Sequence, residues 1–146
     1  RHKFSEHLKK LPNFPGKLHL LKAVQPAEEY FIGQALVFTE DEAAAIVKPE
    51  YRNAPSVKDI VMDKYAKVKN LSEIKKMQYL DMHQWMPGDI LLKADKMAMA
   101  HSLELRVPLL DKKMMECAQV IPTKYLFNEH NKKYAFRQAA FRHIPK

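Results

Sequence analysis

The chain has 146 residues, of which 47% are hydrophobic, and it carries a formal net charge of +8. This length and apolar fraction exclude a disordered tail and are enough for one domain with a buried core. No run approaches the about 18 consecutive apolar residues that a membrane-spanning helix needs. The basic opening residues have no apolar stretch behind them, so we expect no signal peptide.

Glycine and cysteine are both scarce. Only three glycines occur, far apart in the chain, whereas a phosphate-binding loop needs several close together. We therefore expect no glycine-rich phosphate loop in this chain. The single cysteine, Cys117, cannot form an internal disulfide, which fits a reducing, cytoplasmic setting. Its apolar helical neighbours predict a buried structural thiol rather than a nucleophile.

Helix signals dominate, and strand patterns are missing apart from a short extended piece at 105–109. Residues 10–17, with two prolines and a glycine, predict a turn-rich connector, and residues 48–56 a polar joint. Roughly seven helices are predicted, at 26–38, 43–47, 57–68, 73–85, 89–100, 112–121 and 132–144.

Capping residues mark most of these helix starts. Thr39 and Glu42 form a capping box, and an MPGD break at 86–89 leaves Asp89 to cap the next helix. The remaining signals are caps at Ser56, Ser72, Asp111 and Asn131, and proline stops at Pro122 and Pro145. Because there is no internal repeat or linker-like tract, the prediction is one all-α domain spanning 1–146.

Positive charge gathers toward the end of the chain. The net charge is 0 over residues 1–50, +3 over 51–100 and +5 over 101–146. A late basic helix can bind a phosphate ligand or a nucleic acid, and aromatic residues do interleave with the basic ones here. A solvated basic face with its aromatics in a core is the simpler interpretation. The basic residues are Lys132, Lys133, Arg137, Arg142 and Lys146.

Residues 91–111 place many charged side chains in a very apolar stretch. Buried charge is costly unless it is paired, so the run predicts an ion-pair network in which Asp95 or Glu104 meets Arg106. Loss of Arg106 would then leave a partly buried carboxylate unpaired, at about 3–5 kcal/mol. The predicted structural members are Asp95, Glu104, Arg106 and Asp111.

Residues 79–111 closely resemble the late synthetase domain of glutamine-hydrolysing asparagine synthetases. Their sequence is YLDMHQWMPGDILLKADKMAMAHSLELRVPLLD. Family members carry a run like DILxKxDRMSMAHSLExRVPFLD. The departures are Lys96 for a frequent arginine, Ala98 for serine and Leu109 for phenylalanine. Residues 23–42 resemble the helical region after the family's nucleotide-binding core, and residues 131–146 are similar to its TKxxLRxAxxxxLP segment.

The family's SGGxDS pyrophosphate loop, its GSDE acidic motif and its N-terminal glutaminase cysteine do not occur in this chain. The resemblance therefore implies an interior, helical part of an α/β adenine-nucleotide α-hydrolase-like (pyrophosphate-loop) synthetase domain. We expect such a piece to be inactive alone and to hold no metal of its own.

The resemblance also implies a reaction. ATP, assisted by Mg²⁺, adenylates the side-chain carboxylate of aspartate, and ammonia from glutamine then displaces AMP to give asparagine. A β-lactam synthetase, which shares the adenylation step, is the alternative. In the TKxxLR match the catalytic lysine is Lys133. Residues that could approach phosphate are Lys93, Lys96 and Arg137.

Overall fold

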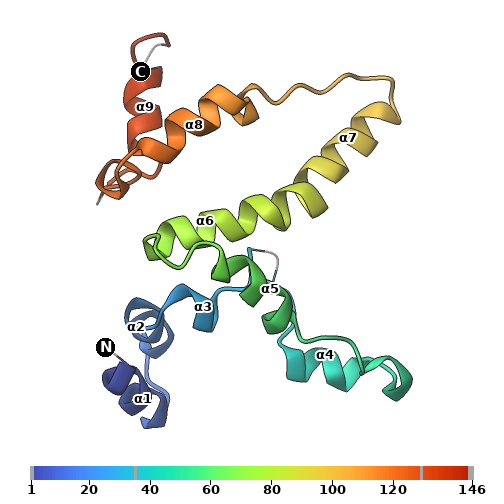
Figure 1. Cartoon of the computed structure of the whole chain (residues 1–146), viewed down its shortest axis with the longest axis vertical. Coiled ribbons are helices and arrows are strands. Elements are labelled where there is room, and N and C mark those ends of the chain that lie inside the picture. Colours follow the sequence, from blue (N-terminus) through green and yellow to red (C-terminus); the bar gives the residue numbers. More distant parts are fainter. Residues whose placement is uncertain (1, 35, 129, 145–146) are drawn as a thin grey trace. The chain divides into compact units, whose positions relative to one another are not determined.

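The computed structural model describes residues 2–34, 36–128 and 130–144. The chain divides into two compact units, Arg1–Ala100 and His101–Lys146, and each is described by itself. Every regular element among the described residues is helical, with one isolated antiparallel bridge and no strand (Figure 1). The all-α prediction is therefore confirmed for the part of the chain that the structure describes.

The first unit contains α1 to α7. Two helices that the sequence patterns did not predict open it, α1 (His2–Lys10) and α2 (Lys17–Val24), separated by the expected turn-rich connector. The others are α3 (Ala27–Tyr30), α4 (Glu40–Ile46), the 3₁₀ turn η1 (Pro49–Tyr51), α5 (Val57–Ala66), α6 (Glu73–His83), the π-helix η2 (Met86–Leu91) and α7 (Leu92–Met99).

The second unit contains two α-helices and two 3₁₀ turns among its described residues. They are the 3₁₀ turn η3 (Pro108–Leu110), α8 (Lys112–Val120), the 3₁₀ turn η4 (Thr123–Tyr125) and α9 (Tyr134–Ala140). Residues 103–107 form no regular element, but the extended piece expected at 105–109 is wrong at its end, because the 3₁₀ turn η3 begins at Pro108. The predicted stop at Pro145 and the charge of Lys146 lie outside the described residues.

Three predicted caps are present as expected, at Thr39, Ser56 and Asp111. Thr39 and Glu42 form the complete capping box of α4: the Glu42 amide donates to Thr39 Oγ1 over 3.3 Å, and the Thr39 amide donates to Glu42 Oε2 over 2.7 Å. The bond from the Thr39 amide, followed by that from the Thr39 hydroxyl, holds the pKa of the Glu42 carboxyl below its usual value. Ser56 Oγ likewise accepts from the Asp59 amide over 3.1 Å at the start of α5.

The helix predicted at 26–38 is wrong, because α3 ends at Tyr30. Tertiary hydrogen bonds take the backbone groups that a longer helix would use: Phe31 O accepts from the Tyr65 hydroxyl over 2.7 Å, and the Gln34 amide donates to Asp81 Oδ1 over 3.2 Å. Gly33 then adopts a left-handed φ of 122°, which glycine tolerates. Ala35, within the predicted span, lies outside the described residues.

The break predicted at 86–89 is also wrong. The ribbon stays coiled from α6 into α7, with the π-helix η2 between them (Figure 1). A π-turn absorbs a residue that does not fit the α-helical hydrogen-bond ladder, and Pro87 lacks the amide that the ladder needs. Asp89 therefore lies inside a helical run and caps nothing.

The buried core of the first unit is small and joins three helices. Ala27 of α3, Val61 and Tyr65 of α5, and Leu80 of α6 are all at most 1% exposed. Val68 completes the buried cluster, and a ring of partly buried side chains packs around it: Phe31, Ile32, Met77 and Tyr79. The relative placement of α3, α5 and α6 depends on this cluster.

Lys76 of α6 lies at the edge of this core and is 7% exposed. Its Nζ donates to Glu28 Oε1 over 2.7 Å and to Glu73 Oε1 over 3.0 Å, while the Glu73 side chain also accepts from the Ala27 amide. The hydrogen bond from Lys76 to Glu28, followed by that to Glu73, raises the pKa of Lys76 against the opposing effect of desolvation. These bonds fasten the start of α3 to α6.

We expect Leu80→Ala to destabilise the first unit by about 2–5 kcal/mol, because it removes buried methyl groups and leaves a cavity. Urea unfolding followed by the fluorescence of Trp85, the chain's single tryptophan, measures this. The matched control is Met97→Ala, at a site in α7 that is 70% exposed, and it should change little. Equal effects of the two substitutions would contradict the assigned core.

We also expect the first unit to lose stability at high pH. The pKa of Lys76 in the folded chain is raised above its ordinary value of 10.5. The stability that the charged lysine contributes is therefore fully present below pH 10.5 and is lost as the pH rises through the pKa of the folded state. Unfolding free energies measured across this range should fall less steeply in Lys76→Met, which cannot titrate. Identical slopes would mean that Lys76 is not paired in solution.

Candidate functional site

The candidate site is the loop that leads into α9, because it carries Lys133. A short antiparallel bridge joins Phe127 to Lys132, and the Tyr134 amide donates to Leu126 O over 3.0 Å. The Asn128 amide donates to Asn131 O over 3.0 Å across the tip. The loop is therefore a closed, hydrogen-bonded turn, in which the chain leaves η4 and returns to begin α9.

Asn128 also closes the tip through its side chain. Its Oδ1 accepts from the Asn131 amide over 2.6 Å and from the His130 amide over 3.1 Å. An asparagine side chain that accepts from amides two and three residues on reproduces a backbone turn. Glu129 lies outside the described residues.

Lys133 is the residue immediately before α9 and has left-handed backbone angles, φ 59° and ψ 39°. The sequence predicted that Asn131 would cap a helix beginning at 132, but Asn131 is used within the loop and the helix begins at Tyr134. Lys132 and Lys133 thus both precede the helix. The prediction that they lie in its first turn, at 132–144, is wrong, so their side chains are not related by a helical rotation.

Arg137 contacts the backbone on both sides of Lys133. Its Nε donates to Lys132 O over 3.0 Å, and its amide donates to Lys133 O over 2.9 Å. The side chains of Lys133 and Arg137 are exposed, and neither forms an ion pair with any residue that the structure describes. The loop therefore presents positive charge without an internal neutralising partner in the described chain.

The phosphate-binding candidates of the first unit are placed differently. Lys93 pairs with Asp89 over 2.7 Å, one helical turn away, and Trp85 Nε1 donates to the same carboxylate over 3.1 Å. The hydrogen bond from Lys93 holds the pKa of Asp89 below its usual value. Lys96 is exposed on α7. Lys93 is thus engaged within its own helix, and a phosphate role for either lysine stays a prediction.

The predicted network of buried charges does not form in the described chain. Glu104 and Arg106 do form an ion pair, but their side chains are 71% and 82% exposed. Asp111 does not join the pair: it caps α8, as its cap signal predicted, by accepting from the Lys113 amide over 2.8 Å. Asp95 is exposed on α7. Cys117 is exposed as well, contrary to the buried thiol expected, and no residue of α8 is buried.

The sequence patterns did not single out Lys76 or Asp81. The spacing of Lys76 from Leu80 puts both on one face of α6, and that signal could have marked the lysine as partly buried. Burial raises the pKa of Asp81 above its usual value. The Asp81 carboxylate accepts a hydrogen bond from the amide of Gln34, which lies in a loop far away in the sequence. No local pattern predicts that contact.

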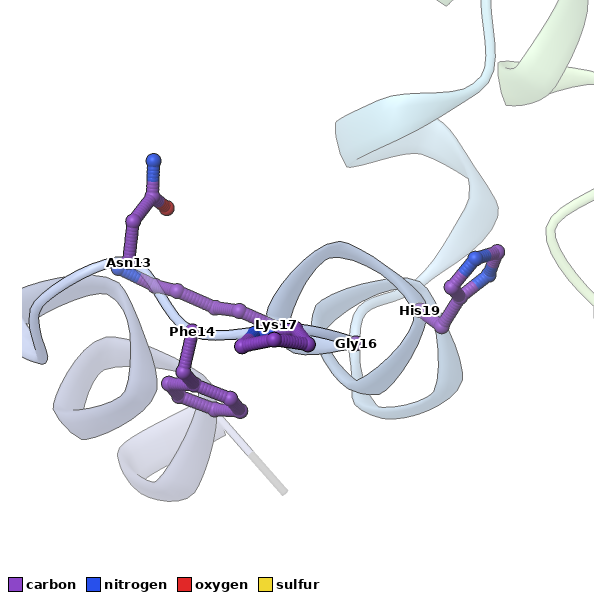
Figure 2. A pocket seen from close by; sticks show the side chains of 6 residues that line it. Asn13, Phe14, Gly16, Lys17 and His19 are labelled. Carbon is purple, nitrogen blue, oxygen red and sulfur yellow. The ribbon is translucent and has the colours of Figure 1, made fainter.

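The connector between α1 and α2 surrounds a hollow lined by residues 13–17 and His19. Figure 2 shows that Asn13, Phe14 and His19 project in different directions around the Lys17 side chain. Lys17 Nζ donates to Leu11 O and, over 3.2 Å, to Lys9 O, so its ammonium already has partners in the connector. These side chains do not converge on a common point, and we assign them no ligand.

Residues 2–146 match the family model for asparagine synthase. The chain belongs to the asparagine synthase family. It is 42% identical over 130 residues to asparagine synthetase [glutamine-hydrolyzing] 1 of Bacillus subtilis, which covers 89% of this chain. It is 35% identical over 124 residues to putative glutamine-hydrolysing asparagine synthetases of Mycobacterium bovis and Mycobacterium tuberculosis, covering 85% of this chain.

The chain spans only 20% of the length of the Bacillus subtilis relative and 19% of the mycobacterial ones. No solved structure matches it. Among the described residues, no helix is long and apolar enough to cross a membrane.

We expect Arg106→Ala to change the stability of the second unit by at most about 1 kcal/mol, because exposed ion pairs contribute little. The sequence had predicted a larger loss of stability, because it predicted that the pair would be buried. Thermal unfolding of the isolated chain, followed by helical circular dichroism, measures the difference. A fall of several kcal/mol in the free energy of unfolding would show that the arginine is buried in solution.

Proposed function

We propose that this chain is part of a glutamine-hydrolysing asparagine synthetase, and that Lys133 is its contribution to the adenylation and amide-forming chemistry. Family membership supports the proposal, as do the activities for which its relatives are named and the match of residues 131–146 to the family's lysine-bearing segment. The substrates would be ATP, aspartate and glutamine, with asparagine, AMP and pyrophosphate among the products.

The observation that carries the role of Lys133 is its place in an ordered basic loop with no acidic partner among the described residues. Adenylation releases pyrophosphate, and attack of ammonia on the acyl-adenylate creates an oxyanion; both need a fixed cation. An unpaired ammonium on a closed loop can supply that charge, whereas one held in an ion pair, such as Lys93, cannot do so without breaking its own contact.

Other parts of the chemistry need polypeptide beyond the described residues. No group of three or more histidine, cysteine or acidic side chains in the described ranges could hold a metal ion, so these residues do not fit a Mg²⁺ site. Large apolar side chains are also widely exposed, among them alternate residues near the start of the second unit: Leu103, Leu105, Val107 and Leu109. Extended apolar exposure is typical of a surface covered by other polypeptide.

We predict that Lys133→Ala, made in the full product of this gene, lowers the kcat of asparagine formation at least about a hundredfold and leaves glutamine hydrolysis intact. Loss of one charge-stabilising donor costs roughly 3–4 kcal/mol of barrier. Lys133→Arg should restore little, because a planar guanidinium does not place its charge where a compact ammonium does. Release of AMP and pyrophosphate and formation of asparagine are measured together.

Lys132→Ala is the matched control. Alanine keeps the Lys132 carbonyl that accepts from Arg137, so the loop geometry should persist and activity should change little. A harmless Lys133→Ala would refute the catalytic assignment, and a crippling Lys132→Ala beside it would place the essential ammonium one residue earlier.

A further inference from the structure

Lys133 has a backbone conformation that lysine rarely adopts. Among the described residues other than glycine, only Ser102 and Lys133 have a positive φ, and for Lys133 the angle is 59°. Left-handed angles disfavour residues with a Cβ, and they persist only where surrounding contacts hold them. The conformation sets the direction in which the Lys133 side chain leaves the loop.

Two peptide planes define that conformation, and Arg137 binds both. The plane before the Lys133 Cα carries the Lys132 carbonyl, which accepts from Arg137 Nε over 3.0 Å. The plane after it carries the Lys133 carbonyl, which accepts from the Arg137 amide over 2.9 Å. The second bond is ordinary for a residue four positions into a helix, but the first depends on the arginine side chain.

We propose that Arg137 is a positioning residue for the proposed reaction: its Nε–H, by holding the Lys132 carbonyl, directs the Lys133 ammonium toward the reacting groups. The inference rests on the proposed function of Lys133. It differs from the phosphate-binding role that the sequence suggested for Arg137, because it requires a hydrogen-bond donor at Nε and no positive charge. A neutral side chain that donates a hydrogen bond at the same place would therefore serve the positioning role but not the phosphate-binding role.

Two substitutions separate the donor from the charge. Glutamine carries its Nε2 the same number of bonds from the Cα as arginine carries Nε, so Arg137→Gln keeps a donor and removes the charge. Arg137→Met has a side chain of similar length without a donor. Both would be made in the full gene product, with glutamine hydrolysis as the measure of an intact fold.

We expect Arg137→Met to lower the kcat of asparagine formation by about a hundredfold at an unchanged KM for ATP, since a displacement of about 1 Å costs that much. Arg137→Gln should keep most of the activity. An unaffected Arg137→Met would overturn the proposal. So would an Arg137→Gln as damaged as Arg137→Met with a raised KM for ATP, because the arginine would then act through its charge.

A double variant tests whether Arg137 acts through Lys133. In the Lys133→Ala background, Arg137→Met should cause no further loss of kcat, because there is no ammonium left to position. A further loss of similar size would show an independent role and overturn the inference. If Lys133→Ala is itself harmless, the proposed function fails, and any effect of Arg137→Met then contradicts positioning as well.

Discussion

Lys76 pairs with Glu28 of α3 and with Glu73 of its own helix α6, and the core formed by α3, α5 and α6 depends on the connection to Glu28. Lys76 is 7% exposed, so its charge would be costly without these carboxylates. With α3 held in place, Ala27 packs against Tyr65 and Leu80, and the Tyr65 hydroxyl reaches the Phe31 carbonyl. That bond in turn ends α3 early and sends the chain into the irregular segment before α4.

The second unit is held together differently. None of its described side chains is buried, so hydrogen bonds within turns and helices carry its local order. The loop before α9 is the clearest case, since Asn128, the bridge at Lys132 and Arg137 each fasten a different part of it. Such bonds fix local geometry well but contribute only about 1 kcal/mol each, so the unit has little intrinsic stability in isolation.

This contrast between the two units is consistent with the proposal that the chain is part of a longer synthetase. The first unit has a core of its own. The second presents a basic loop with defined backbone geometry and a largely exposed apolar surface, which further polypeptide would cover. In the proposed enzyme, the placement of the Lys133 charge is then local, whereas its approach to substrate depends on parts beyond the described residues.

The sequence alone determined the helical class, the caps at Thr39 and Ser56, the membership implied by residues 79–111, and Lys133 as the residue to test. Each follows from short-range patterns, because capping and helical periodicity act within a few residues. Tertiary structure decided the early end of α3, the burial of Lys76 and the exposure of Arg106. These depend on which groups meet across the fold, and local propensity yields wherever such a contact satisfies a backbone or charged group better.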